Sequence, residues 1–171
     1  MIASSIPEVL RERASLQPND VAFTFIDYDH DWEGVEKSLT WAQLQRRSTS
    51  LANEIRDVSA TGDRAVIIAP QGLDYLVAFL ATLEAGVIGV PLSTPIPGQH
   101  DERVSAVLAD AAPTVILTTS AVSEAVSGYA ASQTTTVNPT VIEVQQIDLD
   151  NCRIHCRGLA RRITGDRLGH R

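Results

Sequence analysis

Lysine, aromatic residues and cysteine are all scarce in this 171-residue chain. Lys37 is the only lysine, aromatic residues make up 5% of the chain, and both cysteines, Cys152 and Cys156, lie in the last 21 residues. A disulfide framework is therefore not expected in residues 1–150. With 44% hydrophobic and 20% charged residues the composition is that of a globular domain, whose core must come from aliphatic side chains and alanine.

Long apolar runs and a secretory leader are also missing. The first residues, MIASSIPEVLRER, have neither the basic start nor the apolar centre of a signal peptide. A membrane-spanning helix needs about 18 mostly apolar residues, and the longest uncharged stretch, residues 125–142, is interrupted by Ser, Gln, Thr and Asn. We therefore expect a cytoplasmic protein without a membrane span.

Charge divides the chain at Asp150/Asn151. Residues 1–150 hold 8 basic and 20 acidic side chains, whereas residues 151–171 hold six arginines and a single acid. The acidic balance of the long part argues against nucleic acid as a partner. We expect a folded part over residues 1–150 and a basic tail over residues 151–171 that is unstructured or arises from a frameshift.

Hydrophobic patterning predicts alternating strands and helices. Strands are expected at 21–26, 65–69, 87–92, 114–117 and 141–144, and Leu39 and Trp41 are expected to close a further short strand. Helices are expected between the strands, with two capping boxes at Ser5/Glu8 and Thr40/Gln43. The helix expected at 73–85 is apolar on most of its faces, so it should be covered on more than one side. This order predicts an α/β fold with a partial doubly wound, mainly parallel sheet and flanking helices.

Two local motifs have a structural interpretation that fits better than a functional one. In the acidic segment that starts at Asp27, a calcium loop would need glycine at the sixth position and glutamate at the twelfth, but Trp32 and Ser38 stand there. A solvated acidic loop over residues 27–37 is expected instead. Gly86 and Gly89 follow a predicted helix, whereas a phosphate loop precedes one, so Gly86 is expected to end that helix.

The histidines and cysteines give no convincing site either. His30 and His100 have no candidate nucleophile near them in sequence. Cys152, His155, Cys156 and His170 could form a zinc quartet, but the second closely spaced ligand pair of a structural site is absent. The arginines of the tail could bind polyanions without specificity, although an unstructured extension is the simpler interpretation.

Four collinear stretches carry a family signature: FTFIDYD, SLTWAQLQRRS, GDRAVIIAPQGLDYLVAFLATLEAGVIGVPLSTP and DERVSAVLADAAPTVILTTS. Over residues 5–150 the chain resembles the N-terminal part of actinobacterial fatty-acyl-AMP ligases, in the adenylate-forming superfamily that also contains acyl-CoA synthetases. The resemblance implies a parent reaction in which MgATP activates a fatty acid to an acyl-adenylate, which then passes to an acyl carrier protein. Fixed hydrogen-bond donors and Mg²⁺ would stabilise the charge that develops at the α-phosphate.

The family's adenylating groups find no matching position in this chain. They are a lysine-containing phosphate loop, an acidic residue for the ribose and a lysine from a mobile C-terminal domain. The resemblance therefore implies no catalytic, cofactor-binding or metal-binding residue here, and ATP and Mg²⁺ only in the intact family. We expect a truncated ligase that is inactive alone. The alternative is a noncatalytic interaction module or decoy that associates with an intact ligase through exposed apolar surface.

Overall fold

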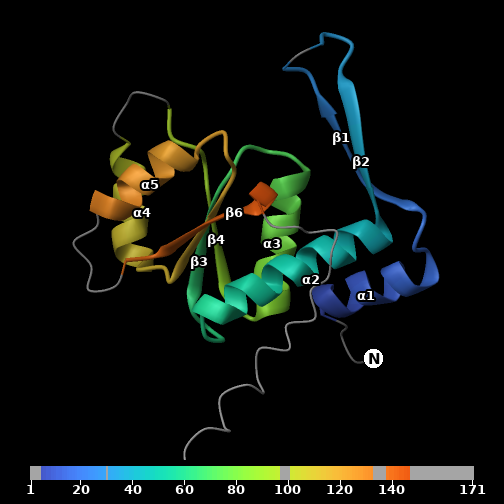
Figure 1. The fold of residues 1–171 in the computed structure, drawn as a ribbon, viewed down its shortest axis with the longest axis horizontal. Helices are drawn as coiled ribbons and strands as arrows, with labels where there is room; N and C mark the ends of the chain where they lie inside the picture. The colour runs from blue at the N-terminus through green and yellow to red at the C-terminus, as the bar shows by residue number, and fades with distance from the viewer. Residues whose placement is uncertain (1–4, 30, 97–100, 133–137, 147–171) are drawn as a thin grey trace, which may run out of the picture.

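The computed structural model describes residues 5–29, 31–96, 101–132 and 138–146. In chain order its elements are α1 (Ile6–Leu16), β1 (Val21–Asp27), β2 (Val35–Thr40), α2 (Trp41–Val58), β3 (Arg64–Ile68), α3 (Leu73–Ala85), β4 (Ile88–Leu92), α4 (Glu102–Ala111), β5 (Val115–Thr118), α5 (Ser123–Ser132), β6 (Thr140–Glu143) and the 3-10 helix η1 (Val144–Gln146). Figure 1 shows a central sheet with helices on both sides and a separate hairpin, β1–β2, that extends away from helices α1 and α2.

The central sheet has four parallel strands in the order β4-β3-β5-β6. Strand β3 pairs with β4 on one side, where Ile68 lies opposite Leu92, and with β5 on the other, where Ile68 lies opposite Thr118. The chain thus moves outward from β3 to β4 and then crosses back to β5, so the direction of winding reverses beside β3. This arrangement confirms the α/β, doubly wound fold expected from the sequence.

Side chains of β3 alternate between two cores, because successive residues of a strand point to opposite faces of its sheet. Ala65 and Ile67 pack with α1, α2 and α3, whereas Val66 and Ile68 pack with α4 and α5. All four side chains have no exposed surface. A strand buried on both faces is typical of a parallel sheet covered by helices, which explains its continuous apolar run.

Helix α3 lies between the sheet and helices α1 and α2 (Figure 1). Val77, Ala78 and Ala81 are fully buried, and the larger apolar side chains of the helix are at least partly buried, as its apolar character predicted. The helix ends as expected at Gly86, whose φ of 78° is left-handed and whose N–H donates to the Leu83 and Thr82 carbonyls.

Exposed apolar side chains occur elsewhere than on α3. The large hydrophobic residues with most exposure include Ile6 and Leu16 on α1, Val21 on β1, and Trp32 between β1 and β2, which is 86% exposed. Among the described residues, the exposed large hydrophobic side chains therefore lie on α1, the hairpin, the end of α2 and at or after β4, and none lies on α3.

The hairpin corrects the expectation of a polar loop over residues 27–37. Strand β2 begins at Val35, so Lys37 lies in a strand, opposite Phe25 of β1, and Trp41 is the first residue of α2 instead of part of a strand. Only two of the six residues of VEKSLT, Val35 and Thr40, are β-branched and none is aromatic, so pairing with β1 accounts for the strand conformation. Pairing partners commonly override weak intrinsic strand propensity.

Candidate functional site

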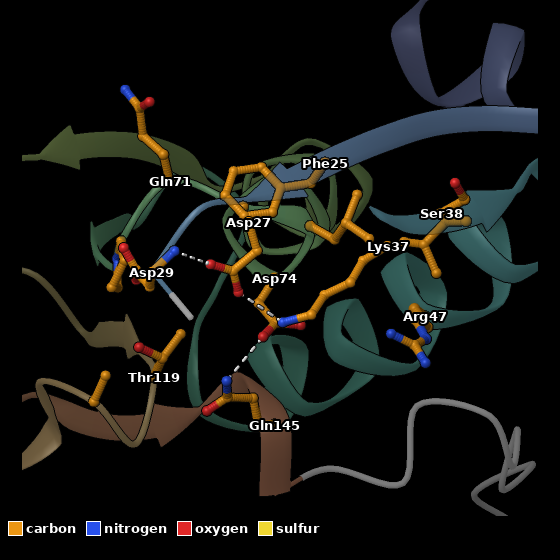
Figure 2. A pocket seen from close by; sticks show the side chains of 15 residues that line it. Phe25, Asp27, Asp29, Lys37, Ser38, Arg47, Gln71, Asp74, Thr119 and Gln145 are labelled. Carbon is orange, nitrogen blue, oxygen red and sulfur yellow. Dashed lines mark hydrogen bonds and ion pairs between the residues drawn. The ribbon is translucent and has the colours of Figure 1, made fainter. Parts of the chain in front are cut away.

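A cavity of about 460 Å³ lies at the carboxyl edge of the parallel sheet, between that edge and the β1–β2 hairpin (Figure 2). Its lining comes from the hairpin, from α2, from the segment that joins β3 to α3, and from the residues that follow β5 and β6; the polar side chains are Asp27, Asp29, Lys37, Ser38, Arg47, Gln71, Asp74, Thr119 and Gln145. Ligands of open α/β sheets bind at this edge, next to the strand where the winding reverses. Here that strand is β3.

The hairpin side of the cavity carries an ion pair. Lys37 Nζ lies 3.0 Å from Asp27 Oδ2, and the other oxygen of Asp27 accepts the Asp29 backbone N–H at 3.0 Å. The Asp27 side chain is 17% exposed and that of Lys37 is 57% exposed. The Lys37 ammonium therefore pairs with one of the two carboxylates on this wall, those of Asp27 and Asp29.

The sheet side of the cavity is held by the side-chain amide of Gln145. Its oxygen accepts the backbone N–H and the hydroxyl of Ser120 at 3.0 and 2.9 Å, and its nitrogen donates to Asp74 Oδ2 at 2.9 Å. These three residues follow three different strands, β6, β5 and β3. One side chain therefore links the segments that leave three strands at the same edge.

Helix α3 begins at this wall. Its N-cap residue is Gly72, which has no side chain to accept the first N–H groups, and Asp74 provides an acidic group in the first turn. A carboxylate at that position interacts favourably with the positive end of the helix dipole. Nearby, Thr119 is only 4% exposed, and its hydroxyl has no hydrogen-bond partner among the residues that the structure describes.

A second cavity of about 410 Å³ lies on the other side of the Pro70–Gln71 segment. It is lined by uncharged residues from β4 and from the segments that follow β3 and β4: Ala69, Pro70, Gln71, Tyr75, Pro91, Leu92, Ser93 and Thr94. The turn after β3 thus separates a charged cavity from a neutral one. The two cavities together can bind and orient polar groups.

Within the described ranges no cluster of three or more His, Cys, Asp or Glu residues could hold a metal ion.

The acidic segment considered as a calcium loop takes another role in the structure. Asp27 pairs with Lys37, and the carboxylate of Asp31 accepts the Glu33 N–H at 3.0 Å, so these acids make local contacts.

Gly89 allows a close approach between β4 and α3, because a Cβ there would lie 2.6 Å from Thr82 Oγ1. The candidates His30, His100, Cys152, His155, Cys156 and His170 lie outside the described residues.

Sequence reasoning assigned no role to Lys37, Asp74 or Gln145, which the structure brings to one cavity. A signal for two of them was available. Asp74 and Gln145 each follow a predicted buried strand within a few residues, and polar residues after parallel strands collect at the sheet's carboxyl edge. The position of Lys37 had no comparable signal, because the segment that carries it, residues 27–37, was expected to be a loop.

Among the residues that the structure describes, no helix is both long enough and apolar enough to cross a membrane.

Comparison with known proteins identifies relatives over most of the chain. The model of the family described as "AMP-binding enzyme" matches residues 10–158. A putative fatty-acid–CoA ligase, fadD25 of Mycobacterium tuberculosis, is 55% identical over 150 residues, which are 88% of this chain and 26% of the relative. A long-chain-fatty-acid–AMP ligase, FadD26 of Mycobacterium marinum, is 55% identical over 149 residues, which are 87% of this chain and 26% of the relative.

A solved structure supports the fold. The crystal structure of a fatty acid AMP ligase from Legionella pneumophila superimposes with a TM-score of 0.69 at 25% identity, and the match covers 87% of this chain and 25% of that one. The chain therefore spans about a quarter of the length of these relatives.

Proposed function

The chain belongs to the AMP-binding enzyme family, and we propose that residues 5–150 form the N-terminal scaffold of a fatty-acid-activating ligase. The observation that carries the proposal is the 55% identity to two mycobacterial proteins, each named as a fatty-acid ligase, over almost all of the folded part. This similarity favours a ligase scaffold over a separate interaction module.

The proposed parent reaction has two steps. A fatty-acid carboxylate attacks the α-phosphate of ATP and releases pyrophosphate, which forms an acyl-adenylate, and the acyl group then passes to an acyl carrier protein with release of AMP. The names of the relatives include both AMP and CoA ligases, so transfer to coenzyme A is the competing second step. ATP and Mg²⁺ as cofactors, a fatty acid as substrate and a cytoplasmic location all belong to this proposal.

In this reaction the described residues form the scaffold on which the loops of the site are placed. The parallel sheet presents the loops after β3, β5 and β6 at one edge, and the hairpin stands over them. Catalysis at an α-phosphate needs fixed donors and a metal ion around the developing charge. We propose that other parts of an intact ligase provide these groups and that residues 1–171 alone do not form the adenylate.

A chimera tests the scaffold role. Residues 1–150 of this chain would replace the matching 150 residues of fadD25, and fatty-acid-dependent ATP–pyrophosphate exchange would be compared with that of unmodified fadD25. We expect the chimera to keep activity within about tenfold, because cores tolerate many simultaneous apolar substitutions when total volume and patterning are kept. A chimera that is folded by circular dichroism but catalyses no exchange would contradict the proposal.

The isolated chain provides the second arm of this test. Residues 1–171 with MgATP and a fatty acid should give no exchange above the level without protein. Exchange that depends on both substrates would show that the chain is catalytic by itself, and would overturn the assignment of the chemistry to other parts of the ligase.

A further inference from the structure

Gln145 stands at the point where the chain leaves the parallel sheet. It lies in η1, directly after β6, and its side chain extends over the wall of the cavity toward α3 (Figure 2). The amide contacts Ser120 on one side and Asp74 on the other. Residues 74, 120 and 145 are far apart in sequence, so these contacts exist only in the folded chain.

The side-chain amide at position 145 matches the chemistry of both contacts. The Ser120 N–H can only donate and the Asp74 carboxylate can only accept when ionised, so the group between them must accept on one side and donate on the other. This requirement also fixes which end of the amide carries the oxygen. A carboxylate at position 145 would accept from Ser120 but would repel Asp74.

A second contact links the segment after β5 to the end of β6, but it does not reach α3. The Ser123 hydroxyl, in the first turn of α5, donates to the Glu143 carboxylate at the end of β6. The segments after β5 and β6 are therefore linked at two places, and Gln145 extends the link to the first turn of α3. Asp74 lies in that turn, close to the N-cap Gly72, which gives the helix no side-chain cap.

We propose that Gln145 is a positioning residue for the cavity wall, and that it holds the N-terminus of α3 and the turn after β5 at a fixed separation. Asp74, Thr119 and Gln145 all line the cavity, so the three segments form one connected wall. The η1 turn itself is thus linked through this amide to the α3 terminus. This inference does not depend on the reaction proposed above.

The test is residue-specific amide exchange and NMR of the full 171-residue chain. In Gln145→Ala the Ser120 N–H loses its acceptor, and its exchange should become about five- to tenfold faster, the range for one lost hydrogen bond. Amides in the buried strands, such as that of Ile67, should keep their protection, because Gln145 is exposed and outside both cores. Gln71→Ala is the matched control: it removes a glutamine from the same cavity whose side chain points away from this wall in Figure 2.

A double variant that swaps the carboxylate and the amide between positions 74 and 145 separates a positioning role from a general effect of substitution. Gln145→Glu alone should disturb the Asp74 and Ser120 resonances, because two carboxylates would face each other. In the double variant Asp74→Asn and Gln145→Glu, the new carboxylate accepts both from Ser120 and from the amide introduced at position 74, while net charge is unchanged. We expect the double variant to restore Ser120 exchange to within about twofold of the original chain.

Two results would overturn the proposal. One is a ratio of the Ser120 to the Ile67 amide exchange rate that is the same in Gln145→Ala as in the original chain. The other is a double variant that is as disturbed as Gln145→Glu, which would show that the wall does not depend on this pair of contacts. If a variant lowers protection of every amide, the ratio of the Ser120 rate to the Ile67 rate still decides between these outcomes.

Discussion

Thr40 and Gln43 hydrogen bond to each other in both directions at the junction of strand β2 and helix α2. The Thr40 hydroxyl accepts the Gln43 N–H at 3.3 Å, and the Gln43 side-chain oxygen accepts the Thr40 N–H at 2.9 Å. Thr40 is at once the last residue of β2 and the N-cap of α2. The pair therefore fixes the direction in which the hairpin leaves the helical layer.

Thr40→Ala should destabilise the protein by about 1 kcal/mol, because an N-terminal donor of α2 loses its acceptor. The matched control is Ser5→Ala, which removes the same kind of cap from α1, where both contacts are exposed. We expect the smaller loss for Ser5→Ala. Urea denaturation followed by circular dichroism measures both, and equal losses would contradict the special importance of the hairpin junction.

Gly89→Ala should destabilise the protein by about 1–3 kcal/mol, the usual cost of overpacking. The added Cβ would lie 2.6 Å from Thr82 Oγ1, between β4 and α3. Gly128→Ala in α5 is the control: a Cβ there meets no atom within 4 Å, so it should stabilise by about 0.5–1 kcal/mol through helix propensity. Denaturation midpoints compare the two variants, and a tolerated Gly89→Ala would show that β4 and α3 can separate without cost.

Thr118→Val should leave stability unchanged or raise it by about 1 kcal/mol, because valine has nearly the same shape and avoids the cost of burying a hydroxyl. The Thr118 side chain is fully buried, and within the part of the chain that the structure describes its hydroxyl has no hydrogen-bond partner. Thr82→Val is the contrasting variant, because the equally buried Thr82 hydroxyl donates to the Phe79 carbonyl at 2.7 Å.

The two threonine variants should therefore differ in sign. Thermal unfolding with the same buffer and scan rate gives the comparison. A destabilised Thr118→Val would indicate that a water molecule or a residue outside the described ranges satisfies that hydroxyl.

Asp101 should contribute to stability at neutral pH and lose that contribution in acid. The Arg103 side chain donates to this N-cap carboxylate, and together with backbone N–H groups of α4 it holds the pKa of Asp101 below its usual value. A lowered pKa in the folded state means that the stabilising effect is present above the unfolded-state pKa and disappears as pH falls through the folded-state pKa. Stability should therefore fall below about pH 4, where an unperturbed aspartate titrates.

Asp101→Asn checks this contribution, since asparagine keeps an N-cap oxygen but cannot titrate. Its stability relative to the original chain should be lowest near neutral pH, and the two should converge in strong acid. A difference that does not change with pH would show that the ionised carboxylate has no role, and NMR titration of the Asp101 carboxyl gives the direction of the pKa shift independently.

Particular residues show where sequence patterning was sufficient. Both capping boxes have the predicted reciprocal bonds, and Gly86 ends α3 in the left-handed conformation, because these signals depend on residues within one turn of each other. The alternating strands and helices were also predictable, since a buried parallel strand is a short apolar run bounded by turns. By contrast, the first half of β2 was expected to be a loop, because the partner that makes VEKSLT a strand is β1.

Apart from β2, the sequence by itself determined the order of the helices and strands, together with the capped helix ends and the AMP-binding family, since all of these depend on local patterns or on collinear similarity. Only the tertiary structure decided that β4 and β5 flank β3, that the hairpin stands over the sheet's carboxyl edge, and that Gln145 meets both Asp74 and Ser120. The physical reason is that residues 74, 120 and 145 approach one another only when the parallel strands before them align in register, and no local pattern encodes that register.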